Sequence, residues 1–188
     1  MKLLIASDIH GSAKYCEMLI DAYKREGADR MLLLGDILYH GPRNDLPQEY
    51  APKKVIEMLN AMKSEIYAVR GNCEAEVDQM VLGFPVLADY ALIPLGEKMV
   101  FATHGHIYNC DNLPPMKSGD ILLHGHTHIP VCERFGEYMY MNPGSVSLPK
   151  NGTHRGYMTL EEMVSEGRGL WVIRWKTLEG EEYMAFDA

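Results

Sequence analysis

Cysteine and long apolar runs are scarce in this sequence, and each scarcity excludes a class of protein. The four cysteines are widely separated and form no Cys-x-x-Cys pair, so neither a disulfide framework nor a thiolate metal cage is expected. The apolar stretch at residues 3–6 is too short for a signal peptide or a membrane span. We therefore expect a cytoplasmic protein with reduced thiols and no membrane association.

Basic residues are also few. The chain has 18 Lys and Arg against 26 Asp and Glu, which gives a formal net charge of −8. This balance provides no broad basic field for gripping a phosphate backbone, so stable nucleic-acid binding is not expected. An anionic substrate would need local positive charge, and bound cations are one source of it.

The overall composition is that of a folded globular protein. Apolar residues make up 47% of the chain and charged residues 23%, close to globular averages. A chain of 188 residues is long enough to bury one core. We predict a single domain over residues 1–188.

The first half of the sequence alternates short apolar runs with helical patterns, which is typical of βαβ units on a parallel sheet. Strands are predicted at 2–6, 31–34 and 66–69, and helices at 13–26, with Ser12 as N-cap and Gly27 as the stop, and at 52–62. The segment 35–51 is rich in Gly, Pro, Asn and Asp, and a loop of this length is more often functional than not.

From residue 86 onward the apolar runs follow one another with little helix between them. Strands are predicted at 86–95, 98–103, 121–123, 131–135, 138–141, 157–160 and 170–175, with tight turns at 96–97, 136–137 and 166–169. Two sheets packed face to face, with helices outside, would bury these strands. We therefore predict an α/β (α+β) fold, a four-layer αββα sandwich of two mixed sheets flanked by helices. A three-layer doubly wound sheet is the alternative.

Five short polar clusters stand at the ends of apolar runs. They are Asp8-Ile9-His10, Gly35-Asp36, Gly71-Asn72-Cys73-Glu74, His104-Gly105-His106 and Gly125-His126-Thr127-His128. Loops that leave the carboxyl ends of strands converge in α/β sheets, so the clusters are expected to meet. Their oxygen and imidazole donors suit Mn²⁺, Fe, Zn²⁺, Co²⁺ or Ni²⁺. Taken alone, Asp8, Gly35-Asp36 and Asn72 are explained as caps or turns, but five such clusters in one short chain favour a metal site.

In order, the motifs D-x-H, G-D, G-N-x-E, H-G and G-H-T-H resemble those of the calcineurin-like metallophosphoesterase superfamily. Asn142-Pro143-Gly144-Ser145 also resembles a segment of small members of that family, so the resemblance runs from residue 2 to about residue 160. The short length and Cys73 resemble the YfcE-type phosphodiesterases in particular. The resemblance implies a metal-dependent hydrolase of phosphate diesters.

The resemblance also implies a binuclear metal centre. One ion would be held by Asp8, His10, Asp36 and His128, and the other by Asp36, Asn72, His104 and His126. Asp36 would bridge two divalent ions, with Mn²⁺ expected and Zn²⁺, Fe²⁺, Co²⁺ or Ni²⁺ as alternatives. The implied reaction is in-line attack on phosphorus by a metal-bridging hydroxide. His106, one residue beyond the motif, receives no ligand role.

The catalytic residues implied by the resemblance are Asn72, Cys73 and His104. Many family members have a histidine at the position of Cys73, and that histidine is credited with protonating the leaving group. A thiol, with a reference pKa of about 8.5, is a poorer acid near neutrality, so help to the leaving group is in doubt. The alternative is that Cys73 is a small, partly buried residue without a catalytic task. His40 and Arg43 are candidate pocket residues, and Arg70 is a candidate phosphate contact, with ordinary loop or surface roles as the alternatives.

Two other functions stay open at this point. A phosphomonoesterase, including a protein phosphatase, would use the same two-metal centre. A non-catalytic scaffold resembling the retromer metallophosphoesterase-like subunit would not need a complete ligand set, whereas every motif position is filled in this chain. The expected partner is therefore a small phosphate-ester substrate, and a homo-oligomer stays open.

Overall fold

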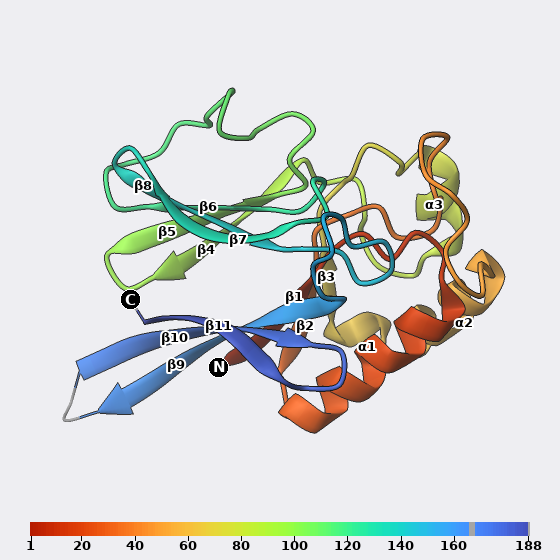
Figure 1. Ribbon diagram of the computed structural model, residues 1–188, viewed down its shortest axis with the longest axis horizontal. Helices are drawn as coiled ribbons and strands as arrows, with labels where there is room; N and C mark the ends of the chain where they lie inside the picture. Colours follow the sequence, from red (N-terminus) through yellow and green to blue (C-terminus); the bar gives the residue numbers. More distant parts are fainter. Residues whose placement is uncertain (166–167, 188) are drawn as a thin grey trace.

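Two mixed β-sheets pack face to face in the computed structural model, which describes residues 1–165 and 168–187 (Figure 1). The six-stranded sheet has the order β11-β10-β9-β1-β2-β3 and the five-stranded sheet the order β4-β5-β6-β8-β7. The strands of the first sheet are β1 (Lys2–Ala6), β2 (Arg30–Leu33), β3 (Ile66–Ala68), β9 (Gly156–Ser165), β10 (Arg168–Thr177) and β11 (Glu182–Asp187). Those of the second are β4 (Tyr90–Leu95), β5 (Lys98–Thr103), β6 (Ile121–His124), β7 (Pro130–Phe135) and β8 (Tyr138–Pro143). The predicted sandwich of two mixed sheets is confirmed.

Alternation along the central strands builds two cores. In β1, Leu3 and Ile5 belong to the core between the sheets, while Leu4 and Ala6 belong to the core under the helices. Successive side chains of a strand point to opposite faces, so a strand buried on both faces is apolar throughout. This is why 2–6 reads as a continuous apolar run.

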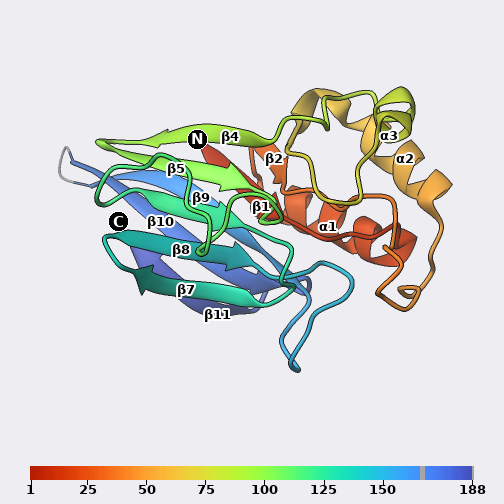
Figure 2. The same cartoon turned by 90° about the horizontal axis from the view of Figure 1, so that it is seen from above.

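The helices are α1 (Ala13–Glu26), α2 (Pro52–Ala61) and α3 (Glu76–Val81), with a 3₁₀ turn at Lys63–Glu65. The Ser12 hydroxyl accepts the Tyr15 N–H at 3.3 Å, and α1 ends at Gly27 in the left-handed conformation with φ 58°, as predicted. Leu19 of α1 and Leu59 of α2 are buried in the core beside the first sheet. Helices and strands gather at opposite ends of the molecule (Figure 2).

In the described part of the chain, a loop and not a helix covers the outer face of the second sheet. The Tyr108 ring, from the segment after β5, lies edge-on to Phe101 with ring centroids 5.4 Å apart. Phe101 in turn stacks on Tyr90 of β4 at 4.7 Å. Aromatic packing of this kind removes apolar area from water without a helical layer. The helices that flank the sandwich are therefore few.

Some element boundaries differ from the prediction. The strand predicted at 86–95 begins only at Tyr90, because Val86 is buried with Leu82 and Phe84 in the helix-side core and does not pair. The strands β9 and β10 are longer than predicted, and α3 and β11 were not predicted at all. The predicted turn at 166–169 falls partly on residues 166 and 167, which lie outside the described residues.

Glu26 joins the end of α1 to the first sheet. Its carboxylate accepts hydrogen bonds from Lys176 Nζ at 2.9 Å, Lys2 Nζ at 2.9 Å and the Tyr157 hydroxyl at 2.8 Å. Burial raises the pKa of Glu26, but these three hydrogen bonds outweigh burial and lower it to about 2. Glu26 therefore keeps its negative charge in the native protein at pH values well below the ordinary pKa of a glutamate.

None of the helices in the described ranges combines the length and the hydropathy that a membrane crossing requires. The single-domain organisation and the cytoplasmic location stay predictions.

Candidate metal centre

The five polar clusters converge at one edge of the sandwich. Asp8 follows β1 and Asp36 follows β2, while His104 and His126 follow the parallel strands β5 and β6. The carboxyl ends of these strands meet at the same place, as expected for the site edge of an α/β sheet. All seven predicted ligand side chains lie within one connected set of short contacts.

The first group consists of Asp8, His10 and His128, all of which are buried. Asp8 Oδ1 lies 3.2 Å from His128 Nε2 and 3.5 Å from His10 Nε2. The two Nε2 atoms are 3.2 Å apart. Burial raises the pKa of Asp8, but the neighbouring side chains of His10 and His128 outweigh burial and hold it well below its ordinary value. The group therefore contains an ionised carboxylate.

The hydrogen bonds at Nδ1 of His10 and His128 determine which nitrogen of each ring carries the proton. His10 Nδ1 lies 2.7 Å from the Tyr39 carbonyl, and His128 Nδ1 lies 2.7 Å from the Leu148 carbonyl. Since a carbonyl only accepts, each Nδ1 carries the proton of a neutral ring and each Nε2 presents a lone pair. Asp8 Oδ1 is also buried without a hydrogen-bond partner among the described residues. Three acceptors facing one another fit a bound metal cation.

The second group is centred on His104. Its Nδ1 lies 2.6 Å from the Leu34 carbonyl, so its Nε2 is again free to accept. This Nε2 lies 3.1 Å from Asn72 Oδ1 and 3.1 Å from His126 Nδ1. Burial and the neighbouring His104 lower the pKa of His126 to about 4, which keeps its ring neutral. Amide oxygen and two imidazoles form a second set suited to a transition metal.

Asp36 lies between the two groups. Its Oδ2 is 3.7 Å from His10 Nε2, and its Oδ1 is 3.5 Å from His104 Nε2. The same carboxylate accepts hydrogen bonds from the backbone N–H of Cys73 at 3.0 Å and from the Cys73 thiol at 3.3 Å. One oxygen toward each group is the arrangement that a bridging ligand needs.

The backbone is strained at the predicted ligands. Five of them have positive φ angles, namely Asp8 (60°), His10 (50°), Asp36 (53°), His126 (66°) and His128 (63°). Non-glycine residues rarely adopt this conformation, and each such residue costs about 1–3 kcal/mol unless its surroundings hold it. Hydrogen bonds from Asp8 N to Gly35 O at 3.1 Å and from His10 N to Asp36 O at 2.9 Å hold two of them.

Glu74 is a structural residue of the site to which sequence reasoning assigned no role. Its buried carboxylate accepts the backbone N–H groups of Asp36 at 2.8 Å, Ile37 at 2.7 Å and Gly71 at 2.6 Å. A Cβ at Gly71 would collide with the Asp36 carboxylate, so the two loops pass each other only with glycine there. The signal was present in the motif G-N-x-E, but the partners of Glu74 could not be read from it.

The Asn142-Pro143-Gly144-Ser145 segment supports the site from the second sheet. The Asn142 side chain donates to the Gly125 carbonyl at 2.8 Å and to the Thr127 hydroxyl at 3.0 Å. The Ser145 hydroxyl donates to the Asp8 carbonyl at 2.8 Å. Side chains that orient ligand loops in this way tune a metal site without touching the metal.

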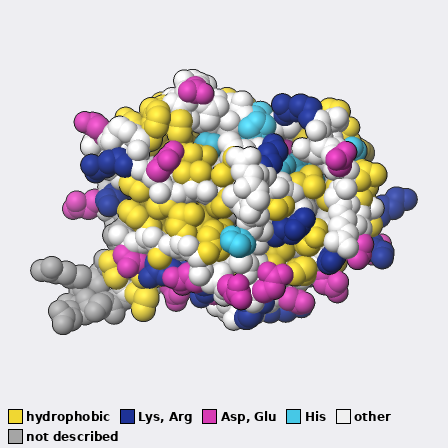
Figure 3. Space-filling view, viewed as in Figure 1, with side chains coloured by type: hydrophobic (Ala, Val, Ile, Leu, Met, Phe, Trp, Pro, Cys, Tyr) yellow, Lys and Arg dark blue, Asp and Glu magenta, His cyan; other side chains and the backbone are white. Residues whose placement is uncertain are grey.

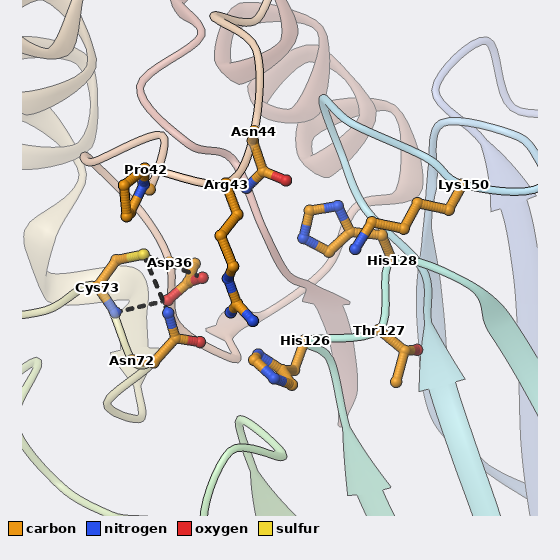
Figure 4. A pocket seen from close by; sticks show the side chains of 11 residues that line it. Asp36, Pro42, Arg43, Asn44, Asn72, Cys73, His126, Thr127, His128 and Lys150 are labelled. Atoms are coloured by element: carbon orange, nitrogen blue, oxygen red, sulfur yellow. Dashed lines mark hydrogen bonds between the residues drawn. The ribbon is translucent and has the colours of Figure 1, made fainter.

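A cavity of about 570 Å³ opens onto the site (Figure 4). Its lining includes Asp36, Asn72, Cys73, His126 and His128, together with Arg43 and Lys150. The predicted pocket role is thus supported for Arg43. His40 is not among the lining residues, because its ring packs edge-on against Tyr39 and Tyr50. Arg70 and His106 do not line the cavity either.

Cys73 forms hydrogen bonds with two of the predicted metal ligands, Asp36 and Asn72. Its thiol donates to Asp36 and accepts a hydrogen bond from Asn72 Nδ2 at 3.2 Å, which turns the Asn72 oxygen toward His104. Burial and the negative charge of Asp36 raise the pKa of the Cys73 thiol. The protein side chains around it therefore favour the protonated thiol.

Comparison with known proteins places this arrangement in a family. Residues 1–163 match the family model for the calcineurin-like phosphoesterase superfamily domain. The chain is 48% identical over 164 residues to phosphodiesterase YfcE of Escherichia coli strain K12, and the alignment covers 87% of this chain and 89% of that protein. The solved structure of the E. coli phosphoesterase YfcE matches with a TM-score of 0.90 and 43% identity, over 99% of this chain and 98% of that chain.

More distant structures share the fold alone. A Vps29 variant from Entamoeba histolytica matches with a TM-score of 0.61 and 20% identity, over 100% of this chain and 99% of that chain. The family model, by contrast, covers most of the chain and all of the polar clusters described above. The chain belongs to the calcineurin-like phosphoesterase superfamily and is accordingly a metal-binding phosphoesterase.

Proposed function

We propose that this protein is a metal-dependent phosphodiesterase that cleaves small phosphate diesters at a centre of two divalent ions, with Mn²⁺ as the native metal. Asp8, His10, Asp36, Asn72, His104, His126 and His128 would hold the ions, and Asp36 would contact both. The observation that supports this most strongly is the convergence of lone pairs and carboxylate oxygens at the ends of separate strands. The name of the E. coli relative, a phosphodiesterase, supports the substrate class.

The protein's own groups prepare the site. When bound, two divalent cations lower the pKa of water and neutralise phosphate oxygens. The carbonyls of Leu34, Tyr39 and Leu148 fix the tautomers of three histidines, so that their Nε2 atoms face the centre. The two oxygens of Asp36 face the two groups of ligands, so this carboxylate would hold both ions. Preorganised ligands of this kind avoid rearrangement during the reaction.

The thiol of Cys73 affects which phosphate esters the enzyme is expected to cleave. Its position is the one where many family members have a histidine, and its thiol already donates to Asp36 at 3.3 Å. A thiol of raised pKa is a weak proton donor near neutrality, so the leaving group must depart with little help. This favours esters with good leaving groups, such as aryl esters. We therefore place diesters and activated esters ahead of alkyl monoesters.

The test compares two chromogenic substrates, bis(p-nitrophenyl) phosphate and p-nitrophenyl phosphate, with Mn²⁺ present. We expect faster turnover of the diester, complete loss after chelation, and recovery when Mn²⁺ is restored. Preference for the monoester would favour the phosphomonoesterase alternative. Undiminished turnover after exhaustive chelation, with the metal content measured near zero, would exclude the two-metal mechanism.

A further inference from the structure

Two cationic side chains, Arg43 and Lys150, line the same cavity as the metal-centre residues. They come from loops far apart in the sequence, one after β2 and the other after β8, and Figure 4 shows both side chains extending into the cavity. Neither side chain has a carboxylate partner among the residues that the structure describes. Both cations are therefore available to a ligand.

The backbone under Arg43 is fixed by its own turn. Gly41 has a φ of 77°, and its carbonyl accepts the Asn44 N–H at 3.4 Å. The Asn44 side chain also donates to the His40 carbonyl at 2.8 Å. Asn side chains commonly stabilise turns in this way, so the loop presents Arg43 from a defined position.

Lys150 is attached directly to the segment that carries the metal-centre histidines. Its backbone N–H donates to the His128 carbonyl at 3.2 Å. Its own carbonyl accepts the Thr153 N–H at 3.1 Å and the Thr153 hydroxyl at 2.7 Å. The backbone of Lys150 is therefore fixed next to the site by hydrogen bonds, which defines the point from which its side chain extends.

The charge balance of the site favours a ligand with more than one negative charge. Two divalent ions, held by the carboxylates of Asp8 and Asp36 and bridged by a hydroxide, would leave the centre with a net charge of about +1. Arg43 and Lys150 would raise the local charge to about +3, in a protein whose formal net charge is −8. Figure 3 shows many acidic side chains along the lower edge of one face. A simple diester, with one negative charge, would leave most of this positive charge uncompensated.

We propose that Arg43 and Lys150 form an anion subsite, and that the preferred substrates are phosphodiesters that carry a second phosphate on one of the esterified groups. This inference rests on the proposed phosphodiesterase function and specifies its substrate class. The planar guanidinium of Arg43 suits bidentate contact with phosphate oxygens, while Lys150 supplies a compact ammonium charge from the loop after β8. The scissile diester occupies the metal centre, and the second phosphate lies toward the mouth of the cavity.

The test uses a matched pair of substrates, the 5′-(p-nitrophenyl phosphate) of thymidine with and without a 3′-phosphate. For the native protein we expect kcat/KM to be about tenfold higher for the 3′-phosphorylated ester, the size of one or two charge-assisted contacts. K150Q and R43Q should each reduce this preference by about three- to tenfold. K54Q, which removes an exposed charge on α2, should leave the preference unchanged.

A binding measurement separates this inference from the proposed function. Titration calorimetry of the Mn²⁺-loaded protein should show tighter binding of thymidine 3′,5′-bisphosphate than of thymidine 5′-monophosphate, with the difference reduced in K150Q and R43Q. Equal binding of the two nucleotides, or a preference that both variants retain, would overturn the subsite. Failure to hydrolyse either ester would instead contradict the phosphodiesterase function, and calorimetry would still decide the subsite.

Discussion

Replacing Glu74 by glutamine tests whether the metal-centre loops are held by one buried carboxylate. The two oxygens of Glu74 accept three backbone N–H groups, from Asp36, Ile37 and Gly71, at 2.6–2.8 Å. A glutamine has one oxygen and one NH₂ group. If the oxygen keeps Asp36 and Gly71, the NH₂ group must face the N–H of Ile37, donor against donor.

The magnitude follows from those contacts. A buried N–H left without an acceptor costs about 1–3 kcal/mol, and the two remaining hydrogen bonds lose the contribution of a charged acceptor. We expect Glu74→Gln to reduce the free energy of unfolding by about 3 kcal/mol, or roughly 10 °C in Tm for a chain of this size. Because Asp36 is no longer held in its positive-φ conformation, metal affinity should fall by about 10–100-fold.

The assay is urea unfolding of the Mn²⁺-loaded protein together with a Mn²⁺ titration. Glu76→Gln is the matched control, since Glu76 is exposed two residues further along the chain. It removes the same charge without a buried contact and should behave like the native protein. Equal stability and equal metal affinity for the Glu74 and Glu76 variants would refute the reasoning.

Three further predictions follow from particular contacts. Glu26 has a native pKa of about 2 against 4.5 for the free group, so its charge adds about 3 kcal/mol of stability above pH 5. This contribution is lost as the pH falls toward 2, so the difference in unfolding free energy between the native protein and Glu26→Gln should shrink over that range. A constant difference would contradict the ion-pair assignment. Cys73→His should raise rates for poor leaving groups by up to about 10²–10⁴-fold, and equal slopes of rate against leaving-group pKa, with the imidazole seen in place, would defeat the idea. Asp36→Asn should lose more activity than a substitution at His10, and near-native turnover with full metal content would disprove bridging.

Local chemistry made much of the fold predictable. The ends of α1 follow from Ser12 and Gly27, whose capping preferences act within a few residues. The strand β1 follows from an apolar run that needs no distant information. By contrast, α3 exposes its apolar residues Val77 and Met80, so it has no buried stripe to reveal it. The strand β11 was missed because charged residues stand at both of its ends.

The sequence predicts which side chains gather at the site, whereas the residues that support them could not be predicted; the metal-ligand roles stay predictions. Family motifs name the polar residues, but contacts such as His10 to His128 span 118 positions along the chain. The roles of Glu74 and Asn142 depend on which backbone groups the fold brings to them. The approach of Lys150 to the cavity likewise depends on the packing of the second sheet, which no local pattern encodes.

The central claim is that seven side chains hold two divalent ions with Asp36 between them. The most direct measurement is metal content per chain, by mass spectrometry of the Mn²⁺-loaded protein, combined with anomalous diffraction to locate the ions. The account predicts two ions, one near His10 and His128 and the other near His104 and His126, with both in contact with Asp36. One ion or none per chain, or ions bound elsewhere, would contradict it.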